Sequence, residues 1–275
     1  MEPAPIGIFD SGYGGLTVLK EIKAVLPQYD YLYLGDNARA PYGTRSFDTV
    51  YAYTLESVKW FFNHGCQLVV LACNTASAKA LRSIQQKDLE QLGKEKRVLG
   101  VIRPTAETIG ALSETGHIGV MGTSGTVQSG SYVIEIKKYF PAVKVNQEAC
   151  PIWVPLVETN ENKSPGADYF IIQHIENLLE KDPKIDTILL ACTHYPLLMD
   201  KIRQFTPGHI RIVSQGNTVA QSLKNYLLRH PEMDGNCSKN GGLQFFTTGD
   251  VVDFENHGTS FFGEQIKAQK TSIFQ

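Results

Sequence analysis

Residues 68–79 read LVVLACNTASAK, and this stretch indicates the fold of the chain. Its first four residues, Leu68–Leu71, form an apolar run that is too short for a helix and typical of a buried parallel strand. The apolar residues that follow recur at helical spacing, at Ala76, Ala80, Leu81 and Ile84. Cys73 is therefore expected at the carboxyl end of a strand, which is where open α/β sheets bind their ligands.

A second stretch repeats this pattern. Residues 187–198 read TILLACTHYPLL, which predicts an apolar strand, then Cys192, then a helix from about Pro196. One cysteine after a strand is unremarkable. Two cysteines at equivalent turns of a duplicated unit predict a pair of thiols that face one site.

Composition bounds the class of protein. The chain has 275 residues, 42% hydrophobic and 20% charged, which fits one large α/β domain or two small ones. The net charge of −2, with both signs interspersed, gives no electrostatic footprint for nucleic acid. No apolar run approaches the roughly 20 residues that span a bilayer, and the first residues lack the pattern of a signal peptide. We therefore predict a cytoplasmic protein with no nucleic-acid or membrane partner.

The cysteines are odd in number and contain no CxxC pair: Cys66, Cys73, Cys150, Cys192 and Cys237. In a reducing cytosol this argues against a disulfide framework and leaves thiol chemistry or plain burial. Zinc is the competing interpretation, because Cys192 and His194 can supply two ligands. A second closely spaced ligand pair is missing, so we predict no metal.

Strands alternate with helices along the whole chain, which predicts mainly parallel sheets. We expect two pseudo-symmetric α/β domains with the active site in the cleft between them. Residues 1–102 and 213–275 are predicted to form the first domain, because the closing aromatic stretch is expected to pack back on the first half. Residues 103–212 form the second. In the second domain, one helix is expected from the turn at 122–126 to about Tyr139. In the first domain, 230–242 is expected to be a loop.

Two polar turns precede predicted helices, at 10–15 (DSGYGG) and 122–126 (GTSGT). Their N–H groups and hydroxyls can hold a carboxylate, although helix capping alone also explains them. The spacing at 10–15 fits neither GxGxxG nor the P-loop. A polar loop at 37–45 is long enough to cover a site, and its Tyr42 and Arg45 either contact a substrate or lie at the surface.

Two opposed thiols suggest a specific reaction. A thiol with a pKa of about 8.5 is a fair base as thiolate and a fair acid when protonated. Thiols on opposite sides of one carbon can remove a proton from one face and return it on the other, which inverts a stereocentre. Asp10 is the candidate partner of Cys73, and His194 or Glu158 that of Cys192. Each of these three can instead be an ordinary polar residue at a turn or helix end.

Six motifs carry a family resemblance, and they occur in the family's order over about residues 6–214. The chain resembles the glutamate racemases, the cofactor-independent enzymes of the aspartate/glutamate racemase superfamily. The motifs are DSGYGGL (10–16), GDNARAPYG (35–43), ACNTAS (72–77), GTSGT (122–126), CPIWVPLVE (150–158) and ACTHYPLL (191–198).

The resemblance implies roles for individual residues. Cys73 matches the thiol that deprotonates D-glutamate and Cys192 the thiol that deprotonates L-glutamate. Asp10 matches the carboxylate beside the first thiol, and Glu158 and His194 match the residues beside the second. Substrate-binding positions are implied at Asp10, Ser11, Pro41, Tyr42, Gly43, Asn74, Thr75, Thr123, Thr126, Thr193 and His194.

The resemblance also implies L- and D-glutamate as substrates, no cofactor, a homodimer, and a role in the bacterial cytoplasm supplying D-glutamate for peptidoglycan. The chain departs from the family pattern at Ala191, where Gly is usual, and at 214–217 (SQGN), where an Asp-Ser pair is usual. The second departure is expected to affect the helix start more than the chemistry. The short N-terminus predicts no activation by a cell-wall precursor.

Three other functions stay open at this point. One is a racemase of aspartate or another acidic amino acid. The second is a two-domain binding protein that closes on a dicarboxylate without chemistry. The third is an interaction role, such as binding a topoisomerase.

Overall fold

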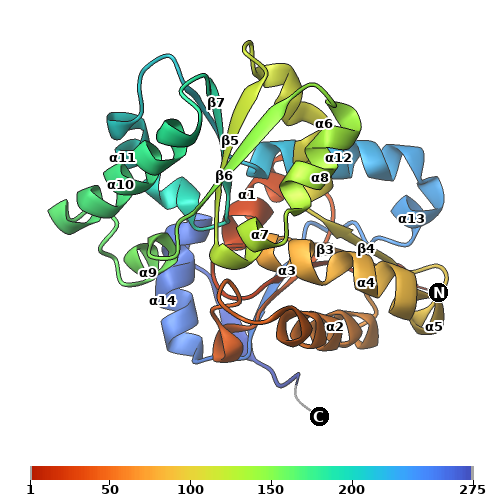
Figure 1. Ribbon diagram of the computed structural model, residues 1–275. Coiled ribbons are helices and arrows are strands. Elements are labelled where there is room, and N and C mark those ends of the chain that lie inside the picture. The colour runs from red at the N-terminus through yellow and green to blue at the C-terminus, as the bar shows by residue number, and fades with distance from the viewer. Residues whose placement is uncertain (1, 274–275) are drawn as a thin grey trace.

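Two parallel sheets organise the computed structural model, which describes residues 2–273 (Figure 1). The first sheet has six strands, in the spatial order β10 (Ala268–Lys270), β9 (Leu243–Thr247), β2 (Tyr31–Gly35), β1 (Ile6–Asp10), β3 (Leu68–Leu71) and β4 (Arg97–Gly100). The second has four, in the order β6 (Lys144–Ala149), β5 (His117–Gly122), β7 (Thr187–Ala191) and β8 (Arg211–Val213). Every neighbouring pair of these strands is parallel, which confirms the predicted α/β class.

Helices connect the strands. They are α1 (Leu16–Val25), α2 (Phe47–Asn63), α3 (Asn74–Lys79), α4 (Leu81–Ser83), α5 (Leu89–Leu92), α6 (Ile102–Ile109), α7 (Ser124–Gln128), α8 (Ser131–Tyr139), α9 (Trp153–Glu158), α10 (Pro165–Lys181), α11 (Met199–Phe205), α12 (Gly216–Arg229), α13 (Pro231–Gly235) and α14 (Val251–Phe262). Shorter 3₁₀ segments lie at η1 (Asn37–Arg39), η3 (Gly110–Leu112) and η4 (Tyr195–Leu198), and a π-helical turn at η2 (Ile84–Asp88).

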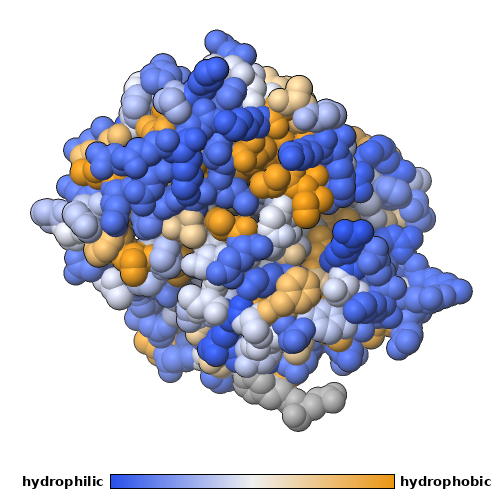
Figure 2. Space-filling view, viewed as in Figure 1, coloured by the Kyte–Doolittle hydropathy of each residue, from blue (hydrophilic) through white to orange (hydrophobic). Residues whose placement is uncertain are grey.

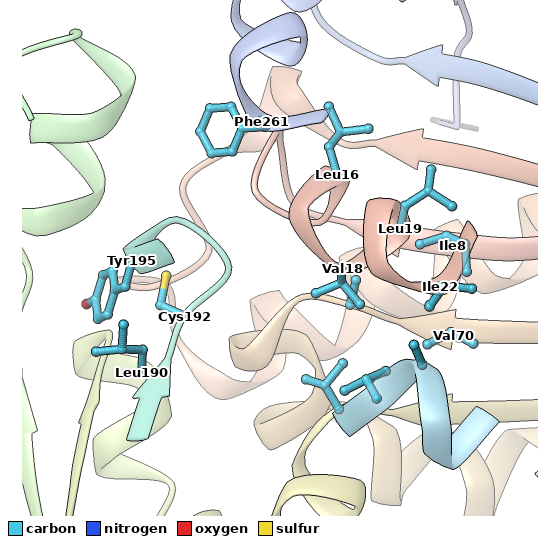
Figure 3. Close-up of a cluster of buried hydrophobic side chains, with 14 of the residues drawn as sticks. Ile8, Leu16, Val18, Leu19, Ile22, Val70, Leu190, Cys192, Tyr195 and Phe261 are labelled. Atoms are coloured by element: carbon cyan, nitrogen blue, oxygen red, sulfur yellow. The ribbon is translucent and has the colours of Figure 1, made fainter. Parts of the chain in front are cut away.

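Both faces of the first sheet are covered, which explains the continuous apolar run of β3. Leu68 and Val70 belong to the core that includes α1, α12 and α14, while Val69 and Leu71 belong to the core that includes α2. Figure 3 shows the α1 side chains Leu19 and Ile22 beside Ile8 and Val70 of the sheet. A strand buried on both faces needs apolar residues at every position.

The C-terminal segment returns to the first sheet, because β9 pairs with β2 and β10 with β9. This confirms that the closing aromatic stretch packs on the first half, where Phe254, Phe261 and Phe262 of α14 join its core. The strands of the second sheet all come from one continuous stretch, 117–213. The domain boundaries at 102–103 and 212–213 stay a prediction.

Three helix predictions need correction. The single helix expected up to Tyr139 is two helices, because Gly130 adopts a left-handed conformation (φ 64°) between α7 and α8. The expected loop at 230–242 contains the short helix α13. The helix expected from about Pro196 begins as a 3₁₀ segment and becomes α-helical at Met199.

The surface in Figure 2 is mostly hydrophilic, with a limited apolar patch near α8. Between residues 2 and 273, no helix combines the length and the apolar character needed to cross a bilayer.

Candidate active site

A cavity of about 140 Å³ lies where the carboxyl ends of the two sheets meet. It is lined by turns that follow strands of both sheets and by the loop after β2: Ser11, Gly12, Ala40, Pro41, Tyr42, Gly43, Thr44, Cys73, Asn74, Thr75, Thr123, Ser124, Pro151, Val154, Pro155, Glu158, Cys192, Thr193 and His194. Each sheet contributes one cysteine to it, Cys73 after β3 and Cys192 after β7. Both thiol-bearing residues are only 6% exposed.

Most of the predicted site residues line this cavity, but Asp10 and Thr126 do not. They lie directly behind residues that do, since both are bonded to the lining threonines. Sequence reasoning missed the small and apolar lining residues, namely Gly12, Ala40, Thr44, Ser124, Pro151, Val154 and Pro155. Side chains that line a site by shape carry no chemical signal in a single sequence. Pro151, Val154 and Pro155 lie in a motif that was quoted only for its resemblance.

Cys73 caps helix α3. Its Sγ accepts a hydrogen bond from Ala76 N at 3.5 Å and donates one to Ser11 Oγ at 3.6 Å. Burial raises the pKa of the Cys73 thiol to about 12, and the neighbouring Asp10 carboxylate adds to the rise. A free thiol therefore holds its proton here at neutral pH, despite its place at a helix N-terminus.

Asp10 is buried at the end of β1, the strand that neighbours β3. It accepts hydrogen bonds from Gly12 N at 2.9 Å and from Thr193 Oγ1 at 3.4 Å. Among the described residues no hydrogen bond joins it to Cys73, which it influences through its charge. Burial raises the pKa of Asp10, and the nearby His194 partly offsets that rise. Asp10 thus joins the turn after β1 to the turn that carries Cys192.

Cys192 faces a histidine and, through it, a carboxylate. His194 Nδ1 lies 4.0 Å from Cys192 Sγ, and His194 Nε2 lies 3.0 Å from Glu158 Oε1. Burial lowers the pKa of His194, but the interactions with Cys192 and Glu158 outweigh it and raise the pKa to about 10. The imidazole is therefore charged at neutral pH, and it lies beside the Cys192 sulfur. Figure 3 places Cys192 beside Tyr195, just past the carboxyl end of β7.

Helix α14, which packs on the first sheet, contacts Glu158 and His194. The sequence did not indicate these contacts. His257 Nε2 donates to the main-chain oxygen of Glu158 at 3.0 Å. The ring of Tyr13 stacks on His257 with a centroid distance of 5.0 Å. Phe261 presents its ring to His194 in an edge contact at 5.1 Å. The C-terminal helix therefore braces the residues beside Cys192.

Three threonine hydroxyls from the two halves meet beside the cavity, which two of them, Thr75 and Thr123, line. Thr75 Oγ1 lies 2.9 Å from Thr123 Oγ1, and Thr123 Oγ1 lies 3.1 Å from Thr126 Oγ1. Thr123 also caps α7 by accepting from Thr126 N at 3.3 Å. Capping and exposure to the cavity, which the sequence offered as alternatives, therefore coexist at Thr123.

The loop after β2 closes the cavity from the first half. Tyr42 donates its hydroxyl hydrogen to Asp36 at 2.5 Å, and Gly43 O accepts from Gly125 N of α7 at 2.8 Å. Lys79 Nζ donates to Arg45 O at 2.7 Å. Main-chain atoms of this loop are thus held by residues of α3 and α7. Within residues 2–273 no group of three His, Cys, Asp or Glu side chains is arranged to hold a metal ion.

Comparisons with known proteins agree with this architecture. Residues 15–222 match the family model for Asp/Glu/Hydantoin racemase. The glutamate racemase of Roseobacter denitrificans is 39% identical, over 95% of this chain and 98% of that protein. The crystal structure of the glutamate racemase isoform RacE1 from Bacillus anthracis matches 99% of this chain and 98% of its own, with 34% identity and a TM-score of 0.89. The glutamate racemase of Francisella tularensis in complex with D-glutamate matches 99% of both chains, with 26% identity and a TM-score of 0.88.

Proposed function

Because the chain belongs to the Asp/Glu/Hydantoin racemase family, we propose that it interconverts L-glutamate and D-glutamate by passing the α-proton between two cysteines without a cofactor. One observation carries this proposal. Cys73 and Cys192 line the same cavity from two different sheets, so a substrate bound between them has a thiol on either side of its α-carbon.

The unlike surroundings of the thiols support one resting state. The charged His194 lies beside Cys192, whereas burial keeps the proton on Cys73 at neutral pH. The Cys192 thiolate takes the α-proton of L-glutamate, and the Cys73 thiol delivers its proton to the opposite face. This step yields D-glutamate, a Cys73 thiolate and a Cys192 thiol. The reverse reaction exchanges the roles.

The α-proton of an amino acid is weakly acidic, so the site must stabilise the charge that develops on the carboxylate. Hydroxyls of Thr75 and Thr123 are available for this at the cavity wall. Donors fixed before the reaction, in a cavity that excludes water, stabilise such charge more than water does. The roles of Asp10, Ser11, Tyr42 and the other predicted binding residues are part of this proposal.

The biological setting is also proposed. Its support is the family and the absence of a membrane-crossing helix among residues 2–273. We place the enzyme in the bacterial cytoplasm, where its D-glutamate enters peptidoglycan. A homodimer and the two domains bounded at 102–103 and 212–213 complete the proposal.

Incubation with L-glutamate in D₂O, with no cofactor added, tests the reaction. Optical rotation and the α-proton NMR signal are followed together. We expect rotation to decay while deuterium enters the α-position. L-Aspartate in a parallel sample is expected to react far more slowly. Neither change, with glutamate still bound, would favour a binding protein over a racemase.

Cys73→Ser and Cys192→Ser assign the bases. A serine hydroxyl is a far weaker acid than a thiol, so each variant is expected to lose at least about 100-fold in turnover. Cys66→Ser is the matched control, because that buried cysteine does not line the cavity. Near-parental turnover by both cavity variants would exclude the two-thiol mechanism.

A further inference from the structure

A closed ring of three hydrogen bonds lies behind the cavity. Asn74 Nδ2 donates to Gln215 Oε1 at 2.8 Å, Gln215 Nε2 donates to the hydroxyl oxygen of Tyr132, and the Tyr132 hydroxyl donates to Asn74 Oδ1 at 2.5 Å. Each of these side chains is at most 4% exposed. The ring joins α3, α8 and the residue before α12, so it ties the first sheet's cysteine turn to the second half of the chain.

A fourth residue, Thr105, determines which partner donates in each hydrogen bond of the ring. The Thr105 hydroxyl donates its hydrogen to Val101 O at 3.0 Å, so its oxygen is left to accept from Gln215 Nε2, also at 3.0 Å. The Gln215 amide therefore has its nitrogen toward Thr105 and its oxygen toward Asn74. With Gln215 fixed, Tyr132 must donate to Asn74, and the Asn74 amide has a single orientation. Hydrogen bonds that run head to tail around such a ring strengthen one another.

Asn74 is the member of the ring that lines the cavity, next to Cys73. Its carbonyl oxygen is occupied by Tyr132, and one of its two amide hydrogens is occupied by Gln215. The second amide hydrogen is what this side chain has left to offer a ligand. We propose that Gln215 and Tyr132 are positioning residues, which hold Asn74 so that it presents an N–H donor to a carboxylate of glutamate. This inference rests on the proposed function.

Gln215 belongs to the segment 214–217, whose departure from the family pattern was expected to affect mainly the helix start. It does precede α12, but its side chain turns to Asn74 rather than to the helix. Gln215 therefore supplies a contact beside the cavity.

Gln215→Glu provides a test with its own pH signature. A protonated carboxyl group has one acceptor for Asn74 and one O–H donor for Tyr132, so it completes the ring. An ionised one has no donor, so the Tyr132 hydroxyl turns toward it and leaves Asn74 Oδ1 unpaired. Burial raises a carboxyl pKa, which brings the change into the range of about pH 5 to 8. We expect the KM for glutamate to rise about tenfold or more across that range, with kcat changing much less.

Gln221→Glu is the matched control, since it makes the same change at an exposed position of α12. Its KM should follow the parent at every pH. Thermal unfolding at each pH separates loss of binding from loss of fold. If the parent racemises glutamate and Gln215→Glu shows the parent's pH profile, the inference is wrong. A parent without racemase activity would instead refute the proposed function.

A double-mutant cycle gives a second readout. Tyr132→Phe removes only the hydroxyl, and we expect it to raise KM about tenfold in the parent but to add little to Asn74→Ala. If the two effects multiply instead, Tyr132 acts by a route other than Asn74, and the inference fails.

Discussion

The two cysteines of the cavity have unlike neighbours, although the reaction they are proposed to catalyse is symmetric. Cys73 lies between a helix N-terminus and the carboxylate of Asp10, and burial dominates its ionisation. Cys192 lies beside His194, which is itself bonded to Glu158. In the proposed reaction, the thiol that acts on L-glutamate is the one of the second sheet, because the charged His194 lies beside it.

The charge of His194 makes a testable contribution to stability. Its pKa is raised from 6.5 to about 10 in the folded chain, so the folded state binds this proton more tightly than the unfolded state. The resulting stabilisation is fully present below about pH 6.5 and is lost as the pH rises through about 10. We expect the difference in unfolding free energy between the parent and His194→Asn to be larger at about pH 6 than at about pH 10. Urea denaturation of both proteins measures it, and a difference that grows with pH would contradict the assignment.

At the scale of elements, the turn after β1 and the turn after β7 pack without space between them. A Cβ atom on Gly14 would lie 2.2 Å from Thr193 Oγ1 and 2.5 Å from His194 Nδ1. Thr17 of α1 also donates its hydroxyl hydrogen to Thr193 O at 3.0 Å. The glycine turn at 10–15 therefore serves to admit the turn that carries Cys192, in addition to opening α1.

Gly14→Ala is expected to push these turns apart. Overpacking of a close contact costs about 1–3 kcal/mol, and here the displaced atoms include the partner of Cys192. We expect a comparable loss in unfolding free energy and at least a tenfold loss in glutamate turnover. Gly208→Ala is the control, because a Cβ atom there meets nothing within 4 Å. Equal unfolding free energies and equal turnover of the two variants would contradict this prediction, because they would show that the two turns can move apart at no cost.

The sequence predicted elements better than the contacts between them. The strands ending before Cys73 and Cys192 were located because apolar runs and helical spacing are local patterns. The break between α7 and α8 at Gly130 was not predicted, because the sequence does not show whether a glycine within a helical pattern has a positive φ angle. The contacts of Gln215 with Asn74 and of His257 with Glu158 join residues more than 90 positions apart, and no local pattern indicates them. A single sequence therefore reveals the local pattern of each element, but not the side-chain contacts between elements that are distant in the chain.

At the scale of the whole molecule, the five cysteines fall into two classes. Cys73 and Cys192 line the cavity, whereas the other three are buried in the cores and do not: Cys66, Cys150 and Cys237. Reagents that enter the cavity can reach the first class. They can reach the second only when the cores themselves open.

Alkylation with N-ethylmaleimide should distinguish these classes. We expect Cys73 and Cys192 to be modified without global unfolding and to be protected by D-glutamate. The three core cysteines should react only at denaturant concentrations that unfold the chain. Peptide mass spectrometry gives the rate at each cysteine, with the fully denatured protein as the reference in which all five react. Parallel modification of all five under native conditions would contradict this division.

The return of the C-terminal segment to β2 has a consequence for how the chain is made. The four strands of the second sheet are all present once Val213 has been synthesised, but the first sheet lacks β9 and β10 until residue 270 has left the ribosome. Until then the edge of β2 is open, and Asp30 lacks the main-chain donors that Asn240 and Gly242 provide. The first sheet thus begins to be synthesised before the second sheet but receives its last strand after it. The nascent protein must carry an incomplete sheet with an unpaired edge through most of its synthesis.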